Sequence, residues 1–322
     1  MKKSILIVGA GAVGQVYAYH FAKAGYQVHF LLKEKYIAEA KQGFTLYHLN
    51  QDKKRQQPIS FNDFICHSNW DSVAQHTIDQ VWLCVSSTAL TNVDLLAMKA
   101  AIKQATVMVL QPDPADVQRV KQVFDSAQVV AGMINMISYY APLAGEVVPK
   151  EGVAFWIPPL VPMPVEGQHQ ALTDVLAVLK SSKIPAVAQE NFAAKNVHAS
   201  SFLMVFLAVL ELSDWQFKPL SANKALLKTM ISAQQEVFAA LQAEYGTKPN
   251  FALTCLKTWM MPMILNVAQH IAPLNMEVYM KAHFLKVREQ TLMLLQAYEQ
   301  RAQQHQVSHE ALSGLIKQLQ DK

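Results

Sequence analysis

The sequence is poor in cysteine and in charged residues. Its three cysteines, Cys66, Cys84 and Cys255, are odd in number and far apart, which fits neither a disulfide framework nor a metal cluster. Charged residues are 16% of the chain, against roughly 25% in an average soluble domain. Hydrophobic residues are 52%, which excludes a disordered protein. We expect a folded, cytoplasmic protein.

Neither long apolar runs nor basic runs are present. The run Ile5 to Val8 ends at Gly9, which is too early for a signal peptide. The stretch Phe202 to Leu212 contains Glu211 and is shorter than the roughly 18 to 20 residues of a membrane-spanning helix, so we interpret it as a buried helix. The net charge of +4 is spread thinly, which argues against nucleic acid and suits a small anionic ligand. We therefore expect no membrane partner and no nucleic-acid partner.

Glycine is scarce in the second half, since nine of the eleven glycines lie at or before Gly167. The length of 322 residues suggests two domains, which we place at 1–188 and 189–322. The first half alternates helical stretches with short β-branched runs, and this alternation predicts an α/β domain with a parallel sheet. The expected strands are Ser4 to Val8, Gln27 to Leu32, Gln80 to Val85, Thr106 to Leu110 and Gln128 to Ala131.

The end of the first domain is rich in proline. Segment 147–157 reads as extended structure that finishes the sheet, and a last helix is expected over Gln170 to Lys180. Four prolines lie between these two segments and should exclude a regular helix or a central strand there. They are Pro158, Pro159, Pro162 and Pro164. After about Asn191, apolar residues recur every three to four positions, which predicts an all-helical second domain. Its expected helices are 192–213, 221–244, 250–270, 274–304 and 308–320.

A glycine motif stands between the first strand and the first helix. It reads Gly9-Ala10-Gly11-Ala12-Val13-Gly14, directly before the helical run Gln15 to Ala24. The first glycine allows a tight turn, the second lets the backbone approach a pyrophosphate, and the third lets the helix pack on the strand. The helix N-terminus then offers free N–H groups to phosphates. The motif and its setting predict a Rossmann dinucleotide site.

The end of the second strand bears on the choice of cofactor. Lys33 at this point would neutralise a 2′-phosphate, which favours NADP(H) over NAD(H) and disfavours FAD. If the strand ended one residue later, Glu34 would face the ribose and the preference would reverse. A solvated loop is the other interpretation of Lys33 and Lys35.

These residues resemble the ketopantoate reductases, over nearly the whole chain. The length, the order of domains, Ile5 to Gly14 and Lys33 all match that family, and Lys281 to Thr291 is similar to an atypical branch of it. The resemblance implies an NADPH-dependent oxidoreductase with a Rossmann domain and a helical domain like the C-terminal domain of 6-phosphogluconate dehydrogenase. It also implies reduction of 2-dehydropantoate to pantoate as a candidate reaction, hence pantothenate biosynthesis.

The chain departs from the family on the wall that faces the cofactor. Val85-Ser86-Ser87 stands where the family commonly has a lysine, and Gln111-Pro112-Asp113-Pro114-Ala115 replaces an Asn-Gly-x-Gly turn. We keep Val85, Ser86 and Gln111 as expected cofactor-binding residues on a remodelled wall. A family asparagine of the substrate domain becomes Ala199.

In the second domain, the resemblance implies that Lys195 is the general acid. Hydride transfer to a ketone needs a cation or proton donor near the carbonyl oxygen, although a surface lysine is the alternative interpretation. His198, one helical turn on, is an alternative donor or a structural histidine. The family's glutamate aligns with Glu289 or Gln290, depending on a one-residue shift, and we take Glu289 as catalytic.

A single helix through 280–298 would place His283, Lys286 and Gln290 on one polar face, either for substrate binding or exposed to solvent. The opposite stripe consists of Phe284, Val287, Leu292, Leu295 and Tyr298. Arg288 falls inside that stripe, so it extends to solvent, pairs with a buried acid, or binds an anion.

The sequence therefore favours an NADPH-dependent reductase of a small 2-oxo acid or related ketone, with a possible homodimer. The alternative is an inactive NADP(H)-binding sensor, which would have no use for a proton donor at Lys195. No metal is expected.

Overall fold

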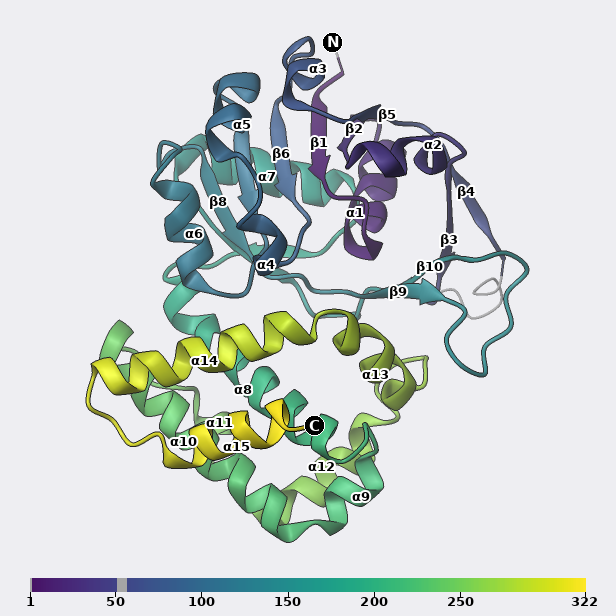
Figure 1. Ribbon diagram of the computed structural model, residues 1–322. Helices are drawn as coiled ribbons and strands as arrows, with labels where there is room; N and C mark the ends of the chain where they lie inside the picture. The colour runs from purple at the N-terminus through teal and green to yellow at the C-terminus, as the bar shows by residue number, and fades with distance from the viewer. Residues whose placement is uncertain (1, 51–56) are drawn as a thin grey trace. The chain divides into compact units, whose positions relative to one another are not determined.

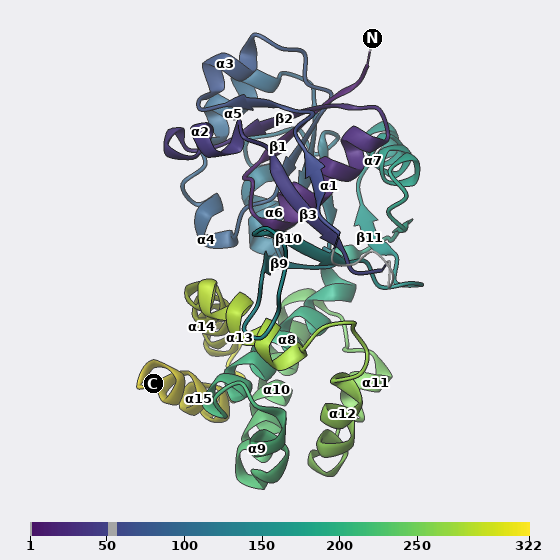
Figure 2. The ribbon, with the colours of Figure 1, turned by 90° about the vertical axis from the view of Figure 1, so that its right-hand side faces the viewer.

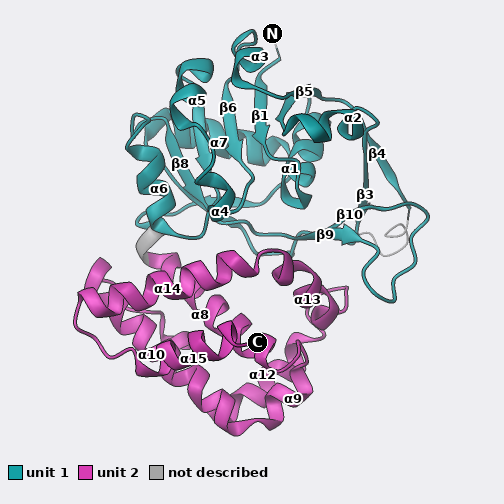
Figure 3. Cartoon of the chain, viewed as in Figure 1, with its two compact units in different colours: residues 1–192 teal, residues 193–322 magenta. Residues whose placement is uncertain are grey.

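The computed structural model describes residues 2–50 and 57–322, with the backbone alone for 193 and 194. The chain divides into two compact units, Met1–Phe192 and Ala193–Lys322 (Figure 3). The first is an α/β unit and the second is helical, as predicted.

An eight-stranded sheet forms the centre of the first unit (Figure 1). Its strand order is β12-β11-β8-β7-β6-β1-β2-β5, and its pairs are parallel except for β11 against β8. The apolar runs of the sequence become central strands because both of their faces are buried. The strands are β1 (Ser4–Val8), β2 (Gln27–Leu31), β5 (Ile65–His67), β6 (Gln80–Leu83), β7 (Thr106–Val109), β8 (Val129–Gly132), β11 (Met163–Glu166) and β12 (Ala186–Ala188).

Two expectations about the proline-rich segment were wrong. The strand β11 contains Pro164 and lies inside the sheet, between β8 and β12. The sheet tolerates this proline because its carbonyl oxygen accepts a hydrogen bond from the N–H of Met133, while neighbouring residues make the other bonds. Segment 147–157 does not finish this sheet, since its strand β10 (Gly152–Trp156) belongs to a second sheet.

The second sheet has four strands and lies against the helix α1 (Ala12–Lys23). It consists of β4 (Ile59–Phe61), β3 (Phe44–His48), β10 and β9 (Ile137–Ala141), in that order. It pairs segments more than a hundred residues apart, Val153 of β10 with Leu46 of β3 for example. This sheet was missed by the sequence analysis.

Helices cover both faces of the main sheet (Figures 1 and 2). One core joins the sheet to α1, α7 (His169–Ser181) and the second sheet. The other core joins it to α3 (Trp70–Ala74), α5 (Leu95–Ile102) and α6 (Pro114–Lys121). Short helices complete the unit: η1 (Glu34–Tyr36), α2 (Ile37–Ala40) and α4 (Ser87–Leu90). Both faces are thus buried, as a parallel sheet requires.

The second unit is built around α8 (Phe192–Leu212), whose residues from Val205 to Leu210 are almost entirely buried. Lys195–Leu212 is also the one stretch of the described chain long and apolar enough for a membrane span, and 61% of it is buried within the fold. The helix α10 (Lys224–Tyr245) packs against α14 (Arg288–Gln304) and α15 (Glu310–Gln320). The α8 segment therefore serves as the core helix of this unit.

Two predicted long helices are broken. The stretch 250–270 forms α11 (Phe251–Thr254), η2 (Thr258–Met260) and α12 (Met261–Ala268), and Pro262, which lacks an N–H group, stands in the first turn of α12, where a helix tolerates it. The stretch 274–304 forms α13 (Met276–Lys286) and α14, because Val287 has φ −114° and ψ 23°, outside the helical region. A short helix, α9 (Phe217–Ala222), precedes α10.

Candidate functional site

The glycine motif forms the turn between β1 and α1. Gly9 has φ +95°, and a Cβ atom added there would lie 2.8 Å from Cγ1 of Val85. A Cβ atom added at Gly14 would lie 2.2 Å from the carbonyl oxygen of Gly9. These two positions require glycine for the turn and for the packing of helix on strand, as the sequence predicts.

Gly11 is a different case. Its φ is −68°, and no atom of the described residues outside its immediate chain neighbours lies within 4 Å of an added Cβ. No side chain caps α1, and its first turn has no acidic residue. The N–H groups of Ala12 and Val13 therefore begin a helix whose positive end faces an open space, which fits a pyrophosphate.

The end of β2 lies beside this turn. The N–H of Gly9 donates to the carbonyl oxygen of Leu31, the last residue of β2, at 3.1 Å. The strand ends one residue earlier than predicted, so the alternative that required a later end and put Glu34 at the ribose is not supported. Lys33 is exposed and stands at the N-cap of η1. Lys35 lies over the ring of Tyr36, at 4.9 Å.

The ends of β6 and β7 complete this edge. Gln111 is buried, and its Nε2 donates to the carbonyl oxygens of Leu83 (3.1 Å) and Val85 (2.7 Å). Gln111 therefore holds the Val85 segment beside the glycine turn, and these amide hydrogens are used inside the protein. The hydroxyl of Ser86 caps α4 by accepting from the N–H of Ala89 at 3.1 Å.

Tyr140 is a residue of this edge that the sequence analysis missed. Its hydroxyl donates to the carbonyl oxygen of Ala10, at 3.5 Å, and its ring is half exposed. Burial, with a further contribution from Glu39, raises the pKa of Tyr140, so it stays a neutral donor. Tyr140 belongs to β9, and the β-branched and aromatic residues Ile137, Tyr139 and Tyr140 are the sequence signal that could have pointed to this strand.

In the second unit, Lys195 and His198 differ in exposure. Lys195 is exposed in the first turn of α8, whereas His198 is almost fully buried. The Nε2 of His198 lies 2.9 Å from the carbonyl oxygen of Thr247, and its ring meets Phe238 edge to face. Desolvation lowers the pKa of His198. These contacts fit the structural interpretation of His198 better than a donor role.

The expected polar face on one continuous helix does not exist. His283 and Lys286 lie on α13, whereas Glu289 and Gln290 lie on α14, beyond the break at Val287. Burial lowers the pKa of His283 to about 4, with a smaller effect of Lys286. Lys286 and Glu289 are exposed. Of the three alternatives for Arg288, pairing with a buried acid is confirmed, because its Nε lies 2.6 Å from Oε1 of Glu211.

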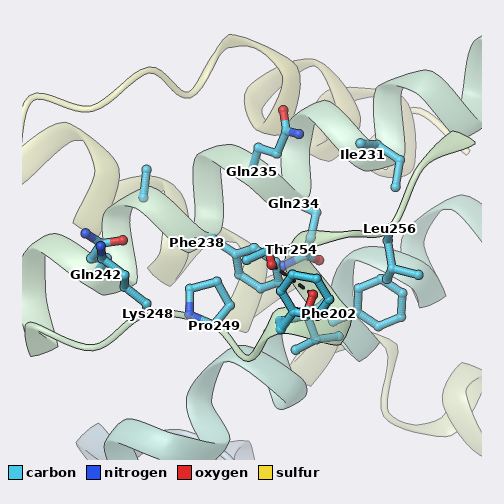
Figure 4. A pocket seen from close by; sticks show the side chains of 13 residues that line it. Phe202, Ile231, Gln234, Gln235, Phe238, Gln242, Lys248, Pro249, Thr254 and Leu256 are labelled. Atoms are coloured by element: carbon cyan, nitrogen blue, oxygen red, sulfur yellow. Dashed lines mark hydrogen bonds between the residues drawn. The ribbon is translucent and has the colours of Figure 1, made fainter.

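A cavity of about 550 Å³ opens within the second unit (Figure 4). Apolar side chains of α8, α10 and the segment after α10 line it, and its polar members are Gln234, Gln235, Gln242, Lys248 and Thr254. Gln234 is buried, and its Oε1 has no hydrogen-bond partner among the described residues. A mostly apolar hollow of this size with a few polar groups is typical of a small-molecule pocket.

The glycine turn follows β1, near the centre of a mostly parallel sheet. The strands β2 and β5 lie on one side of β1, and β6, β7 and β8 lie on the other side. This strand order with a glycine turn defines a Rossmann dinucleotide-binding unit, here followed by a helical unit. Residues 5–161 match the family model described as Ketopantoate reductase PanE/ApbA. The resemblance to the ketopantoate reductases is thus confirmed over most of the first unit. No curated protein matches the chain in sequence.

Solved structures with the same fold extend the likeness to both units. A PanE/ApbA family ketopantoate reductase from Ralstonia eutropha is 18% identical, with TM-score 0.74 over 98% of this chain and 97% of that one. D-mandelate dehydrogenase, solved with NADH and anilino(oxo)acetate, is 11% identical, with TM-score 0.72 over 99% and 97%. A dimeric ketopantoate reductase from Staphylococcus aureus is 14% identical, with TM-score 0.65 over 99% and 98%. At these identities the likeness shows the fold.

Proposed function

We propose that the protein is an NADPH-dependent reductase of a small 2-oxo acid or related ketone, with 2-dehydropantoate, and hence pantothenate biosynthesis, as the candidate. The observation that carries the proposal is the open glycine turn at Gly11 with the exposed Lys33 beside it. In this proposal residues 1–188 bind NADP(H), and residues 189–322 bind the substrate and form the dimer. The family match and the NADH-bound D-mandelate dehydrogenase support a nicotinamide cofactor.

The proposed cofactor site uses the edge where β1, β2, β6 and β7 end. The turn from Gly9 to Gly14 holds the pyrophosphate through its N–H groups and the positive end of α1. Lys33 pairs with the 2′-phosphate as a charge-assisted donor. Val85 and Ser86 form the remodelled wall that Gln111 fixes in place. Bound NADPH supplies the hydride, which goes to the carbonyl carbon of the substrate.

The proposed role of Lys195 is to donate a proton to the carbonyl oxygen as negative charge develops there, so that the product is a 2-hydroxy acid. Glu289 assists as the second catalytic residue. His283, Lys286 and Gln290 orient the substrate, whereas His198 has a structural role and packs α8 against Thr247 and Phe238. We keep Glu289 over Gln290 because it is exposed, whereas Gln290 is partly buried.

The cavity of the second unit is the proposed place for the apolar part of the substrate. Phe202, which lines it, lies seven residues after Lys195 on α8, so that both residues belong to one helix face, two turns apart. Lys248 is the cation in this cavity and suits a carboxylate.

The sensor alternative shares the cofactor site and differs at Lys195. The experiment is an NADPH and NADH fluorescence titration, followed by NADPH oxidation against a panel of 2-oxo acids that includes 2-dehydropantoate. We expect turnover of at least one acid, and a fall in kcat of roughly 10²- to 10⁴-fold in Lys195→Ala with unchanged NADPH binding. Lys228→Ala, an exposed lysine of α10, is the matched control. Tight NADPH binding without turnover would favour the sensor.

Two further proposals concern the cellular location and the oligomeric state of the protein. All three cysteines are free, which supports a reducing cytoplasm as the location. The dimeric enzyme from Staphylococcus aureus supports a homodimer. A set of apolar side chains exposed on the second unit supports it as well: Phe251, Trp259, Met263, Val267 and Ile271.

A further inference from the structure

Three histidines, from β2, β5 and the segment after α3, meet on the first unit. His29 lies in the middle of β2, His67 is the last residue of β5, and His76 follows α3. In the register of β2 with β5, His29 stands opposite Ile65. Because residues two apart in a strand share a face, His29 and His67 point to the same side of the sheet. His76 reaches this side from the connection between α3 and β6.

The three rings are arranged almost as an equilateral triangle. Their centroids are separated by 5.2 Å (His29 to His67), 5.0 Å (His29 to His76) and 5.1 Å (His67 to His76). One ring nitrogen from each lies within 4.8 Å of the corresponding nitrogens of the others. Tetrahedral ligands about 2.0–2.1 Å from a zinc ion stand roughly 3.3 Å apart, so a small inward movement of His76 completes the geometry.

An outer hydrogen bond orients His67 as a ligand. Its Nδ1 lies 3.1 Å from the hydroxyl of Ser72, and that hydroxyl itself donates to the carbonyl oxygen of Asn69 at 3.0 Å. Ser72 therefore accepts from His67, which leaves the Nε2 of His67 without a proton and directed at His29, 2.9 Å away. Metal-binding histidines typically have such a second partner on their other nitrogen.

The three histidines differ in their exposure to solvent. His29 and His67 are 1% and 4% exposed, whereas His76 is exposed and forms the entrance. With the Nε2 of His67 unprotonated, the Nδ1 of His29 donates to it, so binding of an ion moves the His29 proton to its other ring nitrogen and replaces this hydrogen bond. Imidazole nitrogens without carboxylates or carbonyls in the set select transition metals over Ca²⁺ and Mg²⁺.

We propose that His29, His67 and His76 form a binding site for a divalent first-row transition-metal ion of the Zn²⁺ type, with solvent as the fourth ligand. The site uses none of the residues proposed to bind NADPH, and it requires no change in the reductase proposal. Three protein ligands and one open position are the arrangement of accessible zinc sites.

The test is binding of Zn²⁺ and Co²⁺ to the full chain, after removal of metal with a chelator. We expect one ion per chain in a Zn²⁺ titration, visible Co²⁺ absorption bands of tetrahedral intensity, and a rise in Tm with Zn²⁺. His76→Ala should abolish the bands and weaken Zn²⁺ binding at least as much as the roughly 10- to 100-fold loss typical of an outer-shell substitution. Because His76 is exposed, this variant should fold.

Two further variants sharpen the result. Ser72→Ala, which removes the partner of His67, should weaken Zn²⁺ binding by roughly 10- to 100-fold without removing a ligand. His305→Ala, an exposed histidine of the second unit, should change nothing. Zn²⁺ binding that is equal in wild type, His76→Ala and His305→Ala would overturn the proposal, as would the absence of Co²⁺ bands from the wild type. NADPH binding measured on the same samples tests the reductase proposal separately.

Discussion

Arg288 and Glu211 form an ion pair inside the second unit, with Nε and Oε1 2.6 Å apart. Glu211 is the only acidic residue within the apolar helix α8. Its carboxylate is almost fully buried, whereas the Arg288 side chain is 30% exposed. Arg288 begins α14 directly after the break at Val287, so the pair joins that helix start to α8.

We expect Glu211→Ala to destabilise the protein by about 1–3 kcal/mol. Removing one partner of a fully buried pair costs about 3–5 kcal/mol, and the partial exposure of Arg288 reduces this cost. The matched control is Asp214→Ala, whose exposed carboxylate pairs with Lys322 in solvent and should cost much less stability. Urea unfolding of both variants measures the difference, and equal losses would contradict a structural role for the Arg288 pair.

At two glycines of the same turn, an added methyl group should affect the stability of the protein differently. Gly11→Ala meets no described residue, so its stability should stay within about 0.5 kcal/mol of wild type. In the proposed site, however, its methyl group points at the pyrophosphate and should weaken NADPH binding by about 1–3 kcal/mol, or roughly 10- to 100-fold. Thermal unfolding and NADPH fluorescence measure the two effects.

Gly14→Ala is the counterpart of that variant. Its Cβ atom would lie 2.2 Å from a main-chain oxygen, which cannot move without displacing the turn. We expect a clear loss of stability, and with it a loss of NADPH binding. If Gly11→Ala bound NADPH as tightly as wild type while remaining folded, the pyrophosphate would not lie at this helix end.

Lys33 should discriminate between the two nicotinamide cofactors. A charge-assisted hydrogen bond to a 2′-phosphate contributes about 1.5–3 kcal/mol, so Lys33→Ala should weaken NADPH binding by roughly 10- to 100-fold and leave NADH binding unchanged. Lys35→Ala is the control, because this lysine lies over the Tyr36 ring. Parallel NADPH and NADH titrations decide the matter. An equal loss for both cofactors would assign Lys33 to the pyrophosphate or to the fold.

The buried His20 predicts a loss of stability in acid. Burial, with smaller effects of His48 and Lys23 and against a hydrogen bond to the carbonyl oxygen of Ser182, lowers the pKa of His20 to about 4. Because the folded pKa lies below the unfolded value of about 6.5, this contribution is complete above pH 6.5 and is lost as the pH falls toward 4. The expected loss from this residue between pH 7 and pH 5 is up to about 2 kcal/mol.

The measurement is urea unfolding at pH 7 and at pH 5 for wild type, His20→Gln and His305→Ala. Glutamine can still donate to the carbonyl oxygen of Ser182, but it does not titrate. The pH dependence should therefore be smaller in His20→Gln than in wild type, and unchanged in His305→Ala. Identical pH dependence in all three proteins would show that His20 is not the titrating group.

The sequence predicts features that depend on neighbouring residues and misses those that depend on distant ones. The strands around Ile5 to Val8 and Gln80 to Leu83, and the turn from Gly9 to Gly14, follow from local pattern and turn chemistry. The second sheet does not, because its strands are short and the pairing of Leu46 with Val153 joins distant segments. Tyr140 was missed for the same reason.

The breaks in the helices show a second limit. A period of three to four residues continues through Val287 and Pro262, so periodicity alone predicts one helix where the chain forms two at Val287 and three in the stretch 250–270. The three-histidine cluster shows a third limit, since residues 29, 67 and 76 belong to three separate elements. The pairing of β2 with β5 brings His29 and His67 together, and the connection after α3 adds His76.

The exposed apolar side chains of the second unit lead to a prediction about assembly. Phe251 is 82% exposed and Trp259 is 75% exposed, on consecutive short helices whose neighbour α12 also exposes Met263 and Val267. Such a surface costs free energy in water, and a second copy of the chain would cover it. We expect a dimer in sedimentation or light scattering at micromolar concentration, and a shift toward monomer in Trp259→Ser. The control is Leu160→Ser, which removes an even more exposed apolar side chain from the first unit. A dimer that both variants leave equally intact would place the interface elsewhere, whereas a monomeric wild type would rule out the homodimer.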